Sequence, residues 1–391
     1  MSSAGYSNRE LCFEQGPIRP PSEAKSLLVR ITRNCPWNKC LFCRTYKGAT
    51  FSLRSVEEVK QDIETAKKIY DEIKTISWKL GLKGRVSEEV VHYFYHNPEE
   101  YSSSFLSVAM WLYYGEGSVF LQDGNNLMVK TSDLVEILTL LKNTFSEITR
   151  VTSYARAKTI ATKKTVEELQ ALRAAGLSRI HIGLESGSDK VLELIRKGVT
   201  AAEQIEAGRK VKESGISLSE YIIPGLGGKK LWQEHAFETA RALNAINPDF
   251  IRLRTLRVVD GAGLDEKVAS GEFEPMSDEE IVREVRLMIE RLGGIDSSVV
   301  SDHILNLLEE VEGKLPEDKA KMLAVMDRFL ALPFDEKCNF RLGRRTNIYR
   351  TLADLNNPVL YQQVDRALKQ IMAPDGDGLE EVIDELSKRF V

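Results

Sequence analysis

The chain has 391 residues, 42% of them hydrophobic and 29% charged, which suits a folded protein of two or three domains and excludes a disordered or fibrous one. Its 54 basic and 58 acidic residues give a net charge of −4, which excludes a surface coated with basic residues for nucleic acid. Neither an apolar run of about 18 residues nor a basic stretch followed by an apolar one is present, so we expect no transmembrane helix, no secretory signal and a cytoplasmic location.

The N-terminal third contains one clear strand and one clear helix start. Residues 1–25 are polar, contain three prolines and predict an irregular N-terminal arm. Residues 26–32 alternate in the way of a strand. Ser55 and Glu58 have the spacing of a capping box and predict a helix directly after them. Residues 75–116, with their aromatic clusters, are interpreted as a helical insertion.

From residue 118 onward, short apolar stretches alternate with helical ones. Five further strands are predicted, at 118–122, 150–156, 179–185, 216–223 and 250–259. Strands separated by helices form a parallel sheet, and six βα units are too few for a closed eight-stranded barrel. The expected fold is therefore α/β, a partial (β/α)6 TIM-like barrel over residues 26–260. Residues 261–391 are expected to be mostly helical, including a helix over 301–313.

Three of the five cysteines lie close together, at Cys35, Cys40 and Cys43, in a C-x4-C-x2-C pattern. An odd number of cysteines in a chain without a secretory signal is not a disulfide framework. Thiolates at this spacing indicate a bound metal or cluster, because coordination stabilises several neighbouring negative charges. The alternatives are three inert buried cysteines or a redox pair.

The identity of the metal stays open from the residues alone. Zinc needs four closed ligands, and no fourth lies near. A [2Fe–2S] centre of the plant ferredoxin type would use a distant fourth cysteine, for which Cys338 is available. The third possibility is a [4Fe–4S] cluster held by three cysteines, with one iron open to a small ligand.

The first strand leads directly into the cysteine loop, so we expect the loop at the carboxyl ends of the strands, where βα folds place their sites. Alternation then puts His181, Gly183 and Glu185 on the inner face of one strand. Arg252 and Arg254 share a face of another, which favours an anionic ligand. The alternative is that inward arginines pair internally, with Asp123, Glu185 or Glu220 as partners.

His303 is a candidate catalytic residue. Ser301 could cap the helix predicted there, and Asn306 would share the face of His303. A histidine at the barrel mouth could then exchange a proton with a substrate. The alternative is a structural histidine at a helix start.

The cysteine loop with Phe42 before its last cysteine, together with the partial barrel, resembles the radical S-adenosylmethionine (radical SAM) superfamily. The resemblance is to the branch with the Elp3/MiaB/NifB-type core and covers roughly residues 26–260. The usual loop of that family is C-x3-C-x-aromatic-C, so the first spacing here is one residue longer.

The resemblance implies a set of residue roles. It implies that Cys35, Cys40 and Cys43 hold a [4Fe–4S] cluster. It also implies that S-adenosylmethionine (SAM) is bound by residues of the loop and of four successive strands: Phe42, Gln122, Asp123, Gly124, Ser153, Glu185, Lys197 and Ile222. Glu185 would reach the ribose and Lys197 the SAM carboxylate, while the residues around Ile222 would pack on the adenine.

The reaction implied is reductive cleavage of SAM to a 5′-deoxyadenosyl radical, which abstracts a hydrogen from a substrate. We expect a small anionic molecule as substrate, with Arg252 and Arg254 binding it. An external electron donor of the ferredoxin or flavodoxin type is needed, since no second cysteine cluster is visible. A nucleic-acid partner is not expected. Modification of tRNA or protein, and an electron carrier without SAM turnover, are the alternative functions.

Overall fold

The structure is a computed structural model that describes residues 8–371 and 378–388. It divides into two compact units, each of which is described by itself. Unit 1 consists of Met1–Asn38, Thr45–Ile182 and Ala207–Leu218, and unit 2 of Lys39–Arg44, Gly183–Glu206 and Ser219–Val391. The division runs through two strands and one helix, β6, β7 and α8.

Unit 1 contains the first four strands of the main sheet and the helices that follow them. Its strands are β1 (Leu27–Arg30), β4 (Ser118–Gln122), β5 (Arg150–Ala155) and most of β6 (Leu177–Glu185), all parallel, with the short pair β2 (Thr32–Arg33) and β3 (Ser52–Leu53) beside them. Its helices are α1 (Val56–Lys79), α2 (Glu88–His96), α3 (Ser103–Tyr114), α4 (Thr131–Thr144), α5 (Ala157–Lys163) and α6 (Val166–Ala175), with 3-10 turns η1 (Pro21–Glu23) and η2 (Asn126–Met128).

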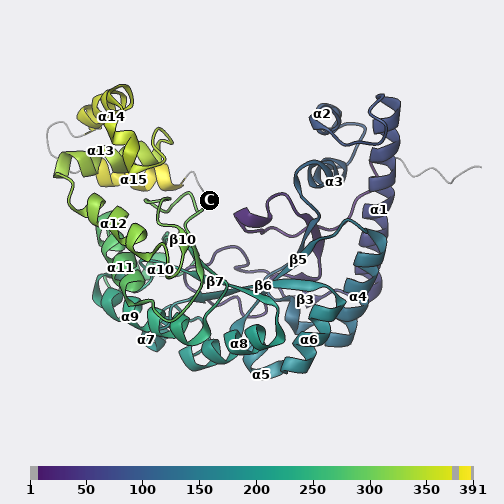
Figure 1. The fold of residues 1–391 in the computed structure, drawn as a ribbon, viewed down its shortest axis with the longest axis horizontal. Helices are drawn as coiled ribbons and strands as arrows, with labels where there is room; N and C mark the ends of the chain where they lie inside the picture. The colour runs from purple at the N-terminus through teal and green to yellow at the C-terminus, as the bar shows by residue number, and fades with distance from the viewer. Residues whose placement is uncertain (1–7, 372–377, 389–391) are drawn as a thin grey trace, which may run out of the picture. The chain divides into compact units, whose positions relative to one another are not determined.

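Unit 2 carries the rest of the sheet and a helical C-terminal part. Its strands are β7 (Ser217–Ile222), β8 (Phe250–Leu253), β9 (Ser298–Val300) and β10 (Gly313–Lys314). Its helices are α7 (Asp189–Leu194), the first part of α8 (Ala201–Ser214), α9 (Gly228–Ile246), α10 (Leu264–Ala269), α11 (Asp278–Arg291), α12 (Lys319–Leu330), α13 (Phe334–Arg345), α14 (Pro358–Ile371) and α15 (Gly378–Lys388), with the 3-10 turn η3 (Leu352–Asn356). Helices α13, α14 and α15 pack together as a group within this unit (Figure 1).

The strand order β1-β4-β5-β6-β7-β8-β9-β10 confirms the α/β class and the largely parallel sheet. The six predicted strands all form, but the main sheet of the described residues contains two more, β9 and the antiparallel β10. Every residue of β4 is buried, as expected for a parallel sheet covered on both faces. Helix α1 begins at the predicted capping box, where Ser55 Oγ accepts from Glu58 N and Glu58 Oε2 accepts from Ser55 N.

Two sequence predictions about strands and helices are wrong. The predicted strand 250–259 ends at Leu253, because the chain then crosses to neighbouring loops: Arg254 N donates to Ile222 O and Leu256 N to Pro224 O. The helix predicted over 301–313 does not form, and this stretch is a loop between β9 and β10. Within the described residues, no helix is long and apolar enough to cross a membrane.

Glu23 fixes the N-terminal arm to the strands of unit 1. Its buried carboxylate accepts hydrogen bonds from Ser26 Oγ at 2.6 Å and Arg150 Nη2 at 3.0 Å, and lies 3.7 Å from His181 Nε2. Burial alone would raise the pKa of Glu23, but the nearby His181 imidazole, the hydrogen bond from Ser26 and the charge of Arg150 outweigh it and lower the pKa to about 2.

Replacement of Glu23 by Gln should therefore remove an acid-sensitive part of the stability. A carboxyl group whose folded pKa lies below its ordinary value of 4.5 stabilises the fold fully above pH 4.5, and loses that contribution as the pH falls toward 2. We expect the free energy of unfolding of the wild type to exceed that of Glu23→Gln by roughly 3 kcal/mol at pH 6, and the difference to shrink steadily toward pH 3. Chemical denaturation across this range measures it. Glu64→Gln, an exposed change on α1, is the control, and a constant difference at all pH values would contradict the assignment.

Candidate functional site

The cysteine loop is where the chain passes from unit 1 to unit 2 and back. Cys35 belongs to unit 1, whereas Cys40 and Cys43 belong to unit 2. Cys43 N donates to Cys40 O at 3.4 Å, which closes a turn that carries both cysteines. All three cysteines are partly exposed, and none forms a disulfide.

The second half of the loop is held firmly inside unit 2. Leu41 N donates to Ile195 O at 2.9 Å, and Leu264 N donates to Leu41 O at 3.0 Å, so both backbone groups of Leu41 are used. The Leu41 side chain is buried with Leu264 and Phe273. Cys40 and Cys43 therefore sit on a backbone whose position is fixed from both sides.

The donor set fits an iron–sulfur cluster in its chemistry. Among residues 8–371 and 378–388 no three His, Cys, Asp or Glu side chains are drawn together as a preformed metal site. The three loop cysteines are nevertheless partly exposed and outside any disulfide, which is what a cluster requires of its ligands. Cys338 differs from them, because it is buried in α13 and burial raises the pKa of its thiol. A buried thiol that resists ionisation is a poor candidate for a fourth ligand.

Three predicted residues come together in unit 2. Lys197 Nζ lies 2.8 Å from Glu185 Oε1 and 5.6 Å from the centre of the Phe42 ring. The side chains of Glu185 and Lys197 are each 11% exposed. Glu185 has a positive φ of 60°, and its carboxylate turns back over Gly183, where an added Cβ would lie 2.0 Å from Glu185 Oε1. Glycine at position 183 is thus what allows the pair to form.

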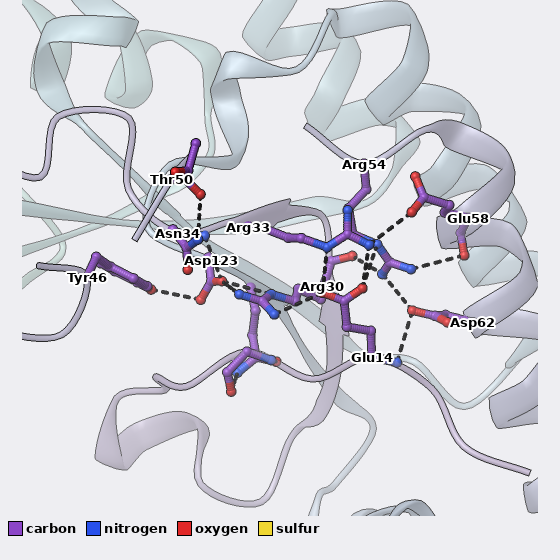
Figure 2. A network of polar contacts seen from close by, with 12 residues as sticks. Glu14, Arg30, Arg33, Asn34, Tyr46, Thr50, Arg54, Glu58, Asp62 and Asp123 are labelled. Carbon is purple, nitrogen blue, oxygen red and sulfur yellow. Dashed lines mark hydrogen bonds and ion pairs between the residues drawn. The ribbon is translucent and has the colours of Figure 1, made fainter. Parts of the chain in front are cut away.

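The predicted SAM-binding turn at Gln122–Gly124 lies against the start of the cysteine loop in unit 1. An added Cβ on Gly124 would meet Cys35 Cβ and the Tyr46 ring at 3.4 Å, so the turn backbone touches Cys35 closely. The Asp123 carboxylate accepts hydrogen bonds from Arg30 at 2.6 and 2.9 Å, from Asn34 N at 3.1 Å and from Tyr46 Oη at 2.7 Å (Figure 2). Asp123 is fully buried, so its side chain orders the turn rather than facing a ligand.

The same network includes Arg30, the arginine of the first strand, and shows that its guanidinium pairs with carboxylates of the protein. Arg30 pairs with Asp123 and with Glu14 of the N-terminal arm, and Glu14 also binds Arg33 (Figure 2). Arg30 is therefore internally paired, as the alternative interpretation had it, and a pairing of buried guanidinium with carboxylate offsets the desolvation of both.

Three other predicted cofactor residues are buried in ordinary structural roles. The Gln122 amide bonds Gly16 and Ile18 of the N-terminal arm. Ser153 Oγ accepts from Asn126 Nδ2 at 3.0 Å. Ile222 is 1% exposed near the end of β7, and directly after it Ile223 joins a buried apolar cluster that Phe42 contacts.

Arg252 and Arg254 do not share a strand face. Arg252 is buried on β8, where Nε donates to Ser219 Oγ at 3.2 Å and Nη1 lies 2.9 Å from Asp302 Oδ2. Arg254 follows the end of the strand and is exposed. The structure thus gives Arg252 a protein partner and leaves Arg254 as the more accessible guanidinium.

His303 lies in a loop, so its predicted helical partnership with Asn306 is wrong. Asn306 instead joins two segments, accepting from Thr255 N at 2.9 Å and donating to Leu253 O at 2.8 Å. Burial, together with the charges of Arg254 and Arg345, lowers the pKa of His303 to about 4. Its Nδ1 accepts from Leu305 N at 3.3 Å, so at neutral pH His303 is an uncharged imidazole.

Glu220 was not among the predicted site residues. It is 1% exposed on β7, and neither carboxyl oxygen has a hydrogen-bond partner within the described part of the chain. Burial raises the pKa of Glu220 well above its ordinary value; the charge of Glu185 adds to this rise and that of Lys197 opposes it. Glu220 is the one charged residue of β7, which was the available signal, but the sequence pattern indicates it only as a partner for arginine.

Residues 107–240 match the family model described as the radical SAM superfamily. A tRNA uridine(34) acetyltransferase of Methanocaldococcus infernus is 26% identical over 117 residues, which are 30% of this chain and 22% of that protein. An uncharacterised protein of Methanocaldococcus jannaschii is 28% identical over 113 residues, 29% of this chain and 34% of that protein.

The chain thus spans only about a fifth to a third of the length of these curated relatives. Among solved structures, methylornithine synthase (PylB) matches with a TM-score of 0.41 and 16% identity, covering 68% of this chain and 63% of that one. The family match includes β4, β5, β6 and β7, which carry Gln122, Ser153, Glu185 and Ile222. Over residues 107–240 this chain is therefore similar to the radical SAM superfamily.

Proposed function

We propose that this protein is a radical SAM enzyme in which Cys35, Cys40 and Cys43 hold a [4Fe–4S] cluster and that it abstracts hydrogen from a small anionic substrate. The family match over residues 107–240 supports the enzyme class and its two cofactors, the cluster and SAM. When bound, the cluster and SAM would supply a 5′-deoxyadenosyl radical, which is the oxidising power of the reaction.

The observation that carries the proposal is the meeting of Glu185, Lys197 and Phe42 in unit 2. Phe42 directly precedes Cys43, so the charged pair lies beside the loop that would bind the cluster. A carboxylate of this kind can accept hydrogen bonds from ribose hydroxyls, and a lysine can pair with a carboxylate of SAM. The apolar cluster around Ile223 and Leu226 offers the adenine a dry surface.

The turn at Gln122–Gly124 has a second supporting role. Because the Asp123 side chain is used internally, any contact of this turn with the SAM ammonium group would be through backbone carbonyls. Its close approach to Cys35 agrees with such a position. Electrons would come from an external donor of the ferredoxin or flavodoxin type.

Modification of tRNA is the second candidate function. It rests on one observation, the similarity to tRNA uridine(34) acetyltransferases, which covers 22% of their length. The composition of the chain, by contrast, predicts no nucleic-acid partner. Incubating the reduced enzyme with SAM and either total tRNA or a metabolite extract, followed by mass spectrometry, separates the two: a new modified nucleoside supports tRNA, whereas a new small product supports the first proposal.

Each single replacement of Cys35, Cys40 or Cys43 by alanine should reduce the iron content to below about a tenth of that of the wild type. The reason is that the two remaining cysteines cannot hold a cluster that needs three. Iron and sulfide are measured after anaerobic reconstitution. Cys12→Ala and Cys338→Ala are the matched controls and should keep full iron. Iron loss in Cys338→Ala with retention in Cys35→Ala would contradict the assignment and favour a four-cysteine centre.

Glu185→Gln should weaken SAM binding at least 10-fold, because the change removes both the carboxylate acceptor and the ion pair that orients Lys197. Equilibrium binding of SAM to the cluster-loaded protein measures this. Glu193→Gln, an exposed change on α7, is the control. Unchanged SAM affinity in Glu185→Gln with intact iron content would remove Glu185 from the site.

A further inference from the structure

Unit 2 contains a cavity of about 540 Å³ that no predicted residue lines. It lies among the chain that follows β8, the start of α11, and helices α13 and α15. Its volume falls in the range of small-molecule sites, roughly 300–1,000 Å³. Its walls carry three arginines, Arg257, Arg341 and Arg345.

Arg257 is the unusual member of this wall. Its Nε and Nη1 are both buried, and neither has a hydrogen-bond partner in the part of the chain that the structure describes. A buried N–H of a charged group without an acceptor costs more than an ordinary unmade hydrogen bond. An anion that enters the cavity would supply the acceptors that this guanidinium lacks.

Arg341 and Arg345 each form an ion pair with a buried carboxylate, whereas on Arg257 the charges of Asp384 and Asp260 act without a buried ion pair among the described residues. Both bind Asp278 at the start of α11, at 2.9 and 2.7 Å, and Asp278 is buried. Arg345 keeps a buried Nε without a partner among the described residues. Asp278 thus neutralises one of these two positive charges and leaves the other available.

Glu380 of α15 takes up the remaining charge in a particular geometry. Both of its carboxyl oxygens lie 2.7 Å from Arg341, one on Nη1 and one on Nη2. This two-pronged arrangement is the one in which guanidinium groups bind carboxylate and phosphate ligands. The Glu380 side chain is 64% exposed, so it is held only at its tip.

We propose that this cavity binds a phosphate or carboxylate group of a small molecule through Arg257, Arg341 and Arg345, and that Glu380 competes with it for Arg341. The next turn of α15 contributes Asp384 to the same wall, so this helix places two acidic residues in the cavity that contains the arginines. The inference goes beyond the proposed radical chemistry, since binding of the anion needs neither cluster nor SAM.

The charge balance of the walls favours a small ligand over a nucleic acid. Alongside the three arginines the cavity is lined by five acids, Asp260, Asp265, Asp278, Glu380 and Asp384. A polyanion such as RNA would be repelled by acids that flank the arginines, whereas one compact anion can replace Glu380 and contact the arginines alone.

The test is calorimetric measurement of the binding of pyrophosphate and of citrate to the full-length, cluster-loaded protein. Pyrophosphate represents a phosphate ligand and citrate a carboxylate ligand. Glu380→Gln should tighten binding of at least one probe about 5- to 10-fold, because the competing carboxylate is gone. Arg257→Met should weaken the same probe at least 10-fold. Gain of affinity in Glu380→Gln cannot arise from misfolding, so it keeps the test decisive even if Arg257→Met is unstable.

Glu381→Gln on the same helix and Arg283→Met on α11 are the matched controls and should bind as the wild type does. Absence of binding by either probe to both wild type and Glu380→Gln would overturn the proposal. So would equal affinity in Arg257→Met and wild type, or binding of tRNA through Arg257 without binding of either small anion. Iron content and SAM binding, measured on the same samples, keep a failure here separate from a failure of the radical SAM proposal.

Discussion

The two backbone hydrogen bonds of Leu41 are the constraint on which the site in unit 2 depends. They fix a short stretch of loop between Ile195, which follows α7, and Leu264, which begins α10. Because Leu41 is held, Phe42 is directed against the apolar cluster and the Lys197 ammonium, while the flanking Cys40 and Cys43 stay partly exposed. A rigid backbone under flexible ligands is what a cluster loop needs, since misplacement by about 1 Å costs binding.

Charged groups next to this loop are arranged so that each has a defined counter-charge. Glu185 pairs with Lys197 in unit 2, and in unit 1 Asp123 pairs with Arg30. The two pairs differ in what they can offer a ligand. Asp123 is fully buried and accepts four hydrogen bonds, whereas the side chains of Glu185 and Lys197 are each 11% exposed.

Period and capping signals in the sequence predicted much of the fold, and they failed where tertiary contacts decided the outcome. The six strands and the start of α1 follow from alternation and from the Ser55–Glu58 capping box. The stretch 301–313 has a helical pattern, yet its Asn306 bonds Leu253 and Thr255 far away in sequence, and its end pairs as β10 with β9. Alternation placed Arg252 and Arg254 on one face, but β8 ends between them. Glu185, Lys197 and Phe42 were named as site residues only through the family resemblance. The cavity that contains Arg257 is formed by segments more than 120 residues apart, so no short stretch of sequence could predict it.

Every function proposed above requires that the loop cysteines hold a cluster with one iron open to SAM. Electron paramagnetic resonance of the anaerobically reconstituted, reduced wild-type protein tests this most directly. We predict a [4Fe–4S]⁺ spectrum whose shape changes when SAM is added, with release of 5′-deoxyadenosine. An iron-free protein, or a [2Fe–2S] spectrum indifferent to SAM, would contradict the account.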